Sequence, residues 1–339
     1  MQDRNRCAFL DKEHNFTIRD CEKPVPKADE VLIKIMANGI CGSDIHFYAE
    51  GRLGNFVVTD PYVPGHEASG TVEGIGEKVV GFTIGDKVVI EPGIPCGRCR
   101  MCLSGRYNLC SSVVFLSAPP VNGTFCDYIC VRADFIHKVP ENTPFEYAAM
   151  AEPAAVAVHS VNRAGAVSGK EGLIFGAGPI GLLMLQAFRA MGGGRTICVD
   201  VIEKRLELAM QLGADQVIDA RNSANLINAA DVVFETAGSP VTTAQIFAAV
   251  RPAGVAVQVG WPSGNVVSMN IADFIEKEIT YTSVNRYANA YPTAIRYISD
   301  GRFDVKPLIT HTFDFDDIPG AFKFAKENPE QVIKVIVKN

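Results

Sequence analysis

A glycine loop between a strand and a helix constrains the fold of this chain more than any other feature. The loop reads Gly176-Ala-Gly178-Pro179-Ile180-Gly181, follows the apolar run 173–175 and precedes the helical run 179–191. The first glycine permits a tight turn, the second lets a pyrophosphate approach the backbone, and the third lets helix and strand pack closely. The helix N-terminus adds free N–H groups and a positive dipole end for phosphate. A glycine-rich turn that binds nothing is the alternative.

An acidic residue in the expected place favours dinucleotide binding over a bare turn. Asp200 closes the next apolar run, 19 residues beyond Gly181, where a carboxylate accepts hydrogen bonds from the ribose hydroxyls. Its charge repels a 2′-phosphate, so the sequence predicts NAD and not NADP. Lys204 and Arg205 follow closely and weaken that preference. We therefore predict that Asp200 and Arg205 join the loop residues in binding the cofactor.

Strand-like and helix-like segments alternate around this loop. The segments 173–175, 196–199, 217–218, 232–234 and 255–259 are short and apolar, whereas 154–164, 179–191, 202–211 and 241–250 have helical periodicity. This alternation predicts a doubly wound parallel sheet, the Rossmann type of α/β fold, over residues 154–285. After Tyr281 the alternation stops.

The first 150 residues have a different character. They consist of short apolar runs, such as 31–36, 68–72 and 87–90, that glycine and proline interrupt. This pattern predicts a β-rich domain with many loops over residues 1–153. The tail, residues 286–339, ends in the strand-like run 331–337. We expect that strand to rejoin the first sheet, so that the nucleotide-binding domain is an insertion in the β-rich domain.

Four of the ten cysteines are spaced as metal ligands: Cys96-x2-Cys99-x2-Cys102-x7-Cys110. In a reducing compartment, clustered cysteines bind metals more often than they form disulfides. Four thiolates suit tetrahedral zinc in a closed, structural site that leaves no position for substrate. An iron–sulfur cluster is the rival, because thiolates bind those as well. Four unligated thiols on a loop would be prone to oxidation.

A second set of possible ligands mixes residue types. Cys41, His66 and Glu67 supply one thiolate, one imidazole and one carboxylate, and three protein ligands with an open fourth position are typical of catalytic zinc. Such an ion acts as a Lewis acid and lowers the pKa of a bound hydroxyl. Glu152 is either a fourth ligand or a partner of the zinc-bound water. Taken singly, His66 could be a core histidine and Cys41 a small apolar filler.

Composition and charge argue against nucleic-acid-binding, membrane-spanning and secreted proteins. The 339 residues carry a net charge of −6 and show no basic stripe, so we expect no nucleic-acid partner. No apolar run approaches the ~20 residues of a membrane span, and no apolar segment follows the basic N-terminal residues as in a secretory signal. We therefore expect a cytoplasmic protein without a membrane partner.

Together these motifs resemble the zinc-dependent medium-chain dehydrogenase/reductase superfamily, and within it the sorbitol (polyol) dehydrogenases. The resemblance covers essentially the whole chain. It is carried by Gly39-Ile-Cys-Gly-Ser-Asp-Ile-His46, Gly51-Arg-Leu-Gly-Asn-Phe-Val-Val58, Pro64-Gly-His-Glu-Ala-Ser-Gly70, the cysteine lobe, Glu152-Pro153, the glycine loop and Ser283-Val-Asn-Arg-Tyr287. It implies a GroES-like catalytic domain beside the Rossmann domain, two zinc ions per chain, and a homotetramer or homodimer.

The resemblance also implies residue roles. Cys41, His66 and Glu67 correspond to catalytic zinc ligands, Ser43 to the hydroxyl that takes the substrate proton, and His46 to the end of a proton relay. Phe115 corresponds to an apolar wall of the substrate pocket, and Arg286 and Tyr287 to contacts with the distal hydroxyls of a polyol. Two positions depart from the family: Phe47 stands where Tyr is frequent and Ala118 where Thr is common, so the identity of the polyol is in doubt.

The activity that follows is NAD-dependent oxidation of a secondary alcohol of a polyol, such as sorbitol or xylitol, to the ketose. The cofactor accepts the hydride, while the protein supplies position and charge. A dehydrogenase of a sugar-alcohol phosphate or a vicinal diol is one alternative. A catalytically silent NAD-binding protein with a structural role is another.

Overall fold

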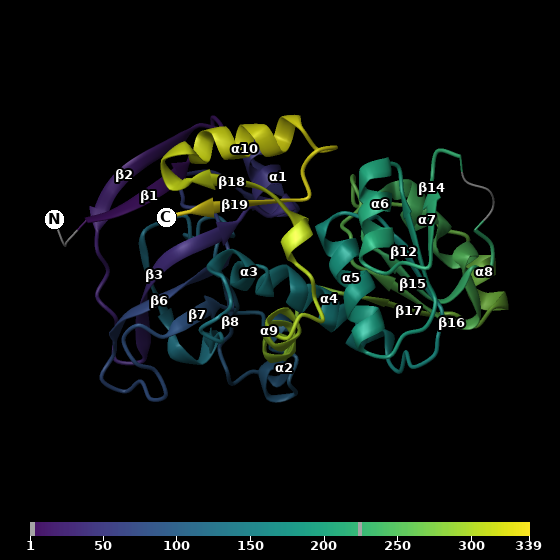
Figure 1. The fold of residues 1–339 in the computed structure, drawn as a ribbon, viewed down its shortest axis with the longest axis horizontal. Coiled ribbons are helices and arrows are strands. Elements are labelled where there is room, and N and C mark those ends of the chain that lie inside the picture. The colour runs from purple at the N-terminus through teal and green to yellow at the C-terminus, as the bar shows by residue number, and fades with distance from the viewer. Residues whose placement is uncertain (1–3, 223–225) are drawn as a thin grey trace. The chain divides into compact units, whose positions relative to one another are not determined.

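The computed structural model describes residues 4–222 and 226–339. The chain divides into two compact units, one made of residues 1–152 and 308–339 and the other of residues 153–307 (Figure 1). The second unit is therefore inserted between two parts of the first. Among the described residues, no helix combines the length and the apolar character that a membrane span requires.

The first unit is built on a mixed sheet of seven strands. Along the sheet the order is β11-β7-β6-β3-β19-β18, and β10 pairs with β3. The strands are β3 (Glu30–Gly39), β6 (Glu67–Ile75), β7 (Lys87–Ile90), β10 (Tyr128–Arg132), β11 (Ile136–Lys138), β18 (Ile309–Asp314) and β19 (Lys334–Lys338). Strand β19 pairs antiparallel with β3, so the predicted return of the tail to the first sheet is confirmed.

Smaller elements surround this sheet. Three antiparallel pairs are formed by β1 (Arg4–Leu10) with β2 (Phe16–Glu22), β4 (Arg52–Leu53) with β5 (Phe56–Val57), and β8 (Gly93–Ile94) with β9 (Val114–Phe115). The helices are α1 (Gly42–Glu50), α2 (Arg100–Leu103), α3 (Phe145–Ala149) and α10 (Ile318–Glu327), and α4 (Ala151–Ala164) begins where this unit ends. Helix α10 packs on β18, β19 and α1 and covers the apolar core that contains Phe315, Phe322 and Val335.

The second unit is a parallel sheet of six strands in the order β14-β13-β12-β15-β16-β17. All of its strand pairs are parallel. Numbered within the unit, the order is 3-2-1-4-5-6, which is the Rossmann order with its switch point between β12 and β15. The strands are β12 (Gly172–Phe175), β13 (Thr196–Asp200), β14 (Gln216–Asp219), β15 (Ala230–Glu235), β16 (Val250–Gln258) and β17 (Thr280–Ser283). The predicted doubly wound sheet is confirmed.

Helices α5 (Pro179–Ala190), α6 (Glu203–Gln211) and α7 (Pro240–Ala249) connect these strands, with α8 (Ile271–Glu276) before β17 and α9 (Tyr291–Ser299) after it. Their apolar residues are buried against the strands; Leu182, Leu183 and Leu185 of α5 are fully buried. Strands covered on both faces read as continuous apolar runs, which is why the sequence showed five of these six strands. Strand β17 is largely exposed and was missed.

The second unit extends further along the chain than the sequence analysis expected. The expected boundary fell at residue 285, but residues 286–307 belong to the second unit. Helix α9 buries Tyr291, Ala294 and Ile298, and the N–H of Asp304 donates to Gln186 Oε1 of α5 at 2.6 Å. These contacts hold the segment to the nucleotide-binding unit, and only residues 308–339 return to the first.

Candidate functional site: two metal-ligand clusters and a dinucleotide pocket

The glycine loop has the geometry that its sequence predicts. Helix α5 begins at Pro179, and Gly178 is its N-cap. Gly176 has a φ of +92°, a conformation that glycine tolerates best. A Cβ on Gly181 would lie 1.8 Å from the carbonyl oxygen of Gly176, so only glycine allows this close packing. Ile180, between them, lies half-buried in the first turn of α5.

A cavity of about 670 Å³ opens beside this loop in the second unit. Its lining includes Gly176, Gly178, Pro179, Asp200 and Arg205. The cavity therefore gathers five of the seven residues that the sequence assigned to the cofactor. Its place at the carboxyl ends of β12, β13 and β15 is where open α/β sheets bind ligands.

Asp200 is the acidic group of this cavity and is held by the backbone. Its Oδ2 accepts from the N–H of Ala177 at 2.6 Å, and its Oδ1 accepts from the N–H groups of Val201 and Ile202 at 2.7 and 2.9 Å. The Arg205 guanidinium lies 4.0 Å from Asp200 Oδ2. The carboxylate thus fixes the end of β13 against the glycine loop.

The four clustered cysteines meet in the first unit. One ligand atom from each of Cys96, Cys99, Cys102 and Cys110 lies within 4.8 Å of the others. The Cys99 and Cys102 sulfurs are 3.4 Å apart, and those of Cys96 and Cys102 are 4.0 Å apart. Sulfurs at ~2.3 Å from one tetrahedral zinc ion are about 3.8 Å apart, so the spacing of this set fits one zinc ion.

The backbone of the cysteine lobe favours thiolates. N–H groups of Arg98 and Cys99 hydrogen-bond the Cys96 sulfur and lower its pKa to about 6. The N–H of Cys102, followed by its thiol, lowers the pKa of Cys99. Burial, followed by the neighbouring thiols, raises the pKa of Cys102 to about 12. Cys96 and Cys99 therefore adopt the metal-binding thiolate form more readily than Cys102.

The second predicted ligand set, Cys41, His66 and Glu67, also comes together; we call it the mixed cluster. Ligand atoms of Cys41, His66 and Glu67 lie within 4.8 Å of one another. Cys41 precedes α1, and His66 directly precedes β6, whose first residue is Glu67. Gly65 shapes the approach: its φ is +94°, and a Cβ there would lie 2.6 Å from the Phe125 ring. A thiolate, an imidazole and a carboxylate in one place fit a zinc ion.

The other predicted catalytic residues lie around this cluster. Glu152 is 7% exposed at the start of α4, outside the set of atoms that lie within 4.8 Å of one another. Ser43 is partly exposed in the first turn of α1. His46, later on α1, has a side chain 53% exposed, and its Nδ1 lies 3.2 Å from Glu50 Oε1. Ser43 and His46 thus lie on the helix that follows Cys41, and the His46 side chain reaches solvent.

The residues predicted to contact substrate fall in both units. In the first, the Phe115 ring lies 5.5 Å from the His66 ring, which places an apolar surface next to the mixed cluster. In the second, Arg286 has a φ of +59°, and the buried Tyr287 ring lies 5.3 Å from that of Tyr291. The Phe115–His66 ring contact lies within the first unit, and the Tyr287–Tyr291 ring contact lies within the second.

The two departures from the polyol pattern have different surroundings. Phe47 is 4% exposed and packs edge-on to Tyr62 with ring centroids 6.1 Å apart, in an apolar cluster that also contains Leu10 and Val58. A phenylalanine therefore serves core packing at this position. Ala118 is partly exposed and donates its N–H to the Phe115 carbonyl at 3.1 Å.

Comparisons with known proteins agree along the whole chain. Residues 27–141 match the family "Alcohol dehydrogenase GroES-like domain", and residues 179–300 match "Zinc-binding dehydrogenase". Sorbitol dehydrogenase of Bacillus subtilis is 40% identical over 98% of this chain and 96% of its own. The chain belongs to the zinc-dependent medium-chain dehydrogenase/reductase superfamily.

Two further relatives narrow the branch. D-xylulose reductase A of Aspergillus oryzae is 37% identical over 95% of this chain and 94% of its own. The crystal structure of L-idonate 5-dehydrogenase from Escherichia coli has a TM-score of 0.93 at 30% identity, covering 100% of this chain and 99% of that one. This medium-chain dehydrogenase therefore lies in the sorbitol dehydrogenase-like branch. It is an oxidoreductase of CH–OH donors that uses zinc and a nicotinamide cofactor.

Asp44 contacts two residues of the mixed cluster, Cys41 and His66. The sequence analysis gave it no role. It is fully buried, accepts from Ser117 Oγ at 2.8 Å and from the N–H of Cys41 at 3.0 Å, and lies 3.6 Å from His66 Nδ1. Burial alone would raise the pKa of Asp44, but the His66 charge and these hydrogen bonds outweigh it and lower the pKa. A carboxylate beside a ligating histidine orients the ring.

Lys334 was missed as well. It lies on β19, is 3% exposed, and donates to both carboxylate oxygens of Glu67 at 2.7 Å. Burial lowers the pKa of Lys334, yet the charges of Glu67 and Cys41 outweigh it and raise the pKa. The signal available in the sequence was a single lysine inside the apolar run 332–337.

Proposed function

We propose that this dehydrogenase oxidises a secondary hydroxyl of a polyol to a ketone, with NAD as hydride acceptor and two zinc ions per chain. The observation that carries the proposal is the convergence of Cys41, His66 and Glu67, within 4.8 Å of one another. Its relatives named sorbitol dehydrogenase and D-xylulose reductase supply the substrate class. A silent NAD-binding protein would have no need of this donor set.

In this proposal Cys41, His66 and Glu67 hold the catalytic zinc, with Glu152 as a fourth ligand or water partner. The ion supplies Lewis acidity at the substrate oxygen, and bound NAD supplies the acceptor for the hydride of the carbinol carbon. Asp44 fixes the His66 ring, and Lys334 holds the charge of Glu67 in place. Phe115 forms an apolar wall that keeps water from the reacting carbon.

The proton takes a route along α1. Ser43 Oγ accepts the proton of the substrate hydroxyl and passes its own toward His46, whose exposed ring delivers it to solvent. In the second unit, Arg286 and Tyr287 contact the distal hydroxyls of the polyol. The guanidinium presents five donors in a fixed fork and can span two hydroxyls.

The preference for NAD rests on Asp200. Its carboxylate faces the cavity in which the ribose would lie and repels a 2′-phosphate. Cys96, Cys99, Cys102 and Cys110 hold the second zinc, which stabilises a lobe with few apolar residues of its own. We further propose a cytoplasmic enzyme that forms a homotetramer or homodimer. Strand β17 is an edge of the parallel sheet, and sheet edges are templates for pairing with another chain.

The test is a substrate panel with the zinc-loaded protein. NAD or NADP reduction is followed with sorbitol, xylitol, a hexitol phosphate, an aldonate, 2,3-butanediol and 2-propanol. We expect a free pentitol or hexitol to give the highest kcat/KM with NAD. Turnover of only the phosphate or only the diol would overturn the polyol assignment.

A variant separates catalysis from cofactor binding. His66→Ala should abolish turnover while NAD still binds in a calorimetric titration, because the two sets of residues lie in different units. A wild-type protein that binds NAD but reduces it with no alcohol would support a structural role. Sedimentation velocity tests the oligomer, since a monomer at all concentrations contradicts it.

A further inference from the structure

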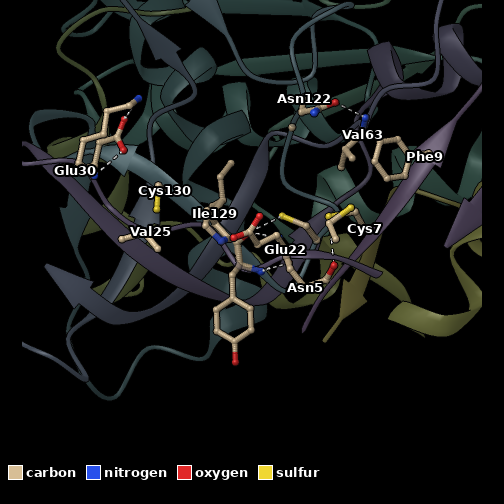
Figure 2. A pocket seen from close by; sticks show the side chains of 16 residues that line it. Asn5, Cys7, Phe9, Glu22, Val25, Glu30, Val63, Asn122, Ile129 and Cys130 are labelled. Carbon is tan, nitrogen blue, oxygen red and sulfur yellow. Dashed lines mark hydrogen bonds and ion pairs between the residues drawn. The ribbon is translucent and has the colours of Figure 1, made fainter. Parts of the chain in front are cut away.

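Four thiols outside the two zinc-ligand clusters line a second cavity. This cavity of about 430 Å³ lies in the first unit, and its lining includes Cys7 of β1, Cys21 of β2, Cys126 just before β10 and Cys130 on β10. Figure 2 shows the Cys7 sulfur at the wall of the cavity, among further sulfur atoms. All ten cysteines are free thiols. The thiols at this cavity do not belong to either ligand cluster described above.

The backbone places Cys7 directly opposite Cys126. The two residues form an isolated antiparallel bridge. The bridge is flanked by hydrogen bonds from Ala8 N to Phe125 O and from Asp127 N to Arg6 O, each 3.0 Å long. Cys7 and Cys126 are therefore a non-hydrogen-bonded pair, in which Cα atoms are about 4.5 Å apart and side chains are closest. That separation lies within the range of about 4.4–6.8 Å found in disulfides.

Cys21 is not equivalent to Cys126. In the β1–β2 register Cys7 faces Arg19, and Cys21 faces Asn5, so Cys7 and Cys21 are diagonal neighbours on one face. Diagonal Cα atoms are about 7–8 Å apart, which is beyond what a disulfide spans without backbone movement. The register thus selects Cys126 as the partner of Cys7.

The two opposed sulfurs differ in character. Hydrogen bonding with Cys126, and then with Cys21, lowers the pKa of Cys7 despite its burial. The pKa of Cys126 is raised well above its usual value by the Cys7 contact and by burial. Cys7 is therefore the more acidic of the two thiols and forms the nucleophilic thiolate more readily than Cys126.

We propose that Cys7 and Cys126 form a reversible disulfide when the protein meets a small hydroperoxide that enters through this cavity. The Cys7 sulfur attacks the peroxide oxygen, which gives a sulfenic acid and releases water or an alcohol. The Cys126 sulfur then attacks the Cys7 sulfur, the S–O bond breaks, and water leaves. Two thiols and one hydroperoxide thus give one disulfide, one water and one further water or alcohol. A small dithiol restores the pair by exchange.

Peptide mapping tests the proposal on the zinc-loaded protein, in which the ligating cysteines are protected. The protein is treated with equimolar hydrogen peroxide, alkylated, and digested with trypsin without reduction. Trypsin places Cys7 in peptide 7–12, Cys21 in peptide 20–27, because the Lys23–Pro24 bond resists cleavage, and Cys126 in peptide 107–132. We expect peptides 7–12 and 107–132 to appear joined, two hydrogens lighter than their sum, with fragmentation assigning the bond to Cys126. Dithiothreitol should separate them.

Variants provide the controls. Cys21→Ser should still form the cross-link, whereas Cys126→Ser should lose it and, with a second equivalent of hydrogen peroxide, let the Cys7 sulfenic acid proceed to sulfinic acid. If Cys126→Ser fails to fold, Cys126→Ala replaces it as the control. The peptide map of the wild-type protein tests the proposal even without these variants. A wild-type protein that gives no cross-link, or one that joins Cys7 to Cys21 or Cys130, would overturn the proposal. Oxidation of Cys7 to sulfinic acid in wild type, with Cys126 left free, would overturn it as well.

Discussion

The ammonium group of Lys334 lies 2.7 Å from each carboxylate oxygen of Glu67 in the interior of the first unit. The two residues are 267 positions apart in the chain, and they are 3% and 1% exposed. Lys334 also donates to the carbonyl oxygen of Ile40 at 3.0 Å. A proposed zinc ligand is thus fixed by a cation from the C-terminal strand.

Replacing Lys334 by Met should destabilise the protein severely. The substitution leaves the Glu67 charge buried without its partner, and breaking a buried pair in this way costs about 3 kcal/mol or more. Urea unfolding measures the change. Lys338→Met is the matched control on the same strand, because Lys338 pairs with Glu146 near the surface, and exposed pairs contribute at most about 1 kcal/mol. Equal losses in the two variants would show that Lys334 does not act through Glu67.

Cys99→Ser should lower both the metal content and the thermal midpoint. Binding free energy at a structural zinc site is folding free energy, so losing a ligand removes it. Elemental analysis should give two zinc ions per chain for wild type and one for the variant. Cys130→Ser, outside the cluster, should keep both ions. A Cys99→Ser protein with unchanged melting temperature, or iron in wild type, would contradict the structural zinc site.

How far the sequence predicts this molecule depends on how local the signal is. The glycine loop, Asp200 and the strands of the second unit are visible because spacing and apolar runs are local features. Asp44 and Lys334 were missed because their partners come from distant segments. Helices α9 and α10 were missed because the alternation of strand-like and helix-like segments stops after Tyr281. Each of them carries a proline, Pro292 and Pro319, in its first turn, where proline is tolerated.

Asp200→Ser should weaken NAD binding and improve the use of NADP. A hydrogen bond to a charged group contributes about 1.5–3 kcal/mol, so we expect roughly a tenfold or greater rise in the KM for NAD. The charge that repels a 2′-phosphate is removed at the same time. Steady-state kinetics with both cofactors gives the ratio. Asp300→Ser, at a surface pair with Arg302 in the same unit, should leave it unchanged, and an unchanged ratio in Asp200→Ser would refute the ribose contact.

Arg286→Ala should lower kcat/KM for polyols by ~10-fold or more and leave 2-propanol nearly unaffected. A short alcohol has no distal hydroxyls for the guanidinium to contact. Alanine keeps a Cβ at the φ of +59°, so the backbone strain is the same in both proteins. The exposed Arg296 of α9 provides the control, as Arg296→Ala should change neither substrate. Equal losses for polyol and 2-propanol would mean that Arg286 supports the fold or the cofactor.

The position of β19 sets an order of events during synthesis. This strand lies between β3 and β18 in the first sheet, and it carries the counter-charge of Glu67. A ribosome releases all of residues 153–307 before it releases β19, so the nucleotide-binding unit can fold while the first sheet still lacks an inner strand. Until β19 emerges, the first unit is a nascent chain with a gap in its sheet, and the charge of Glu67 has no counter-charge from Lys334.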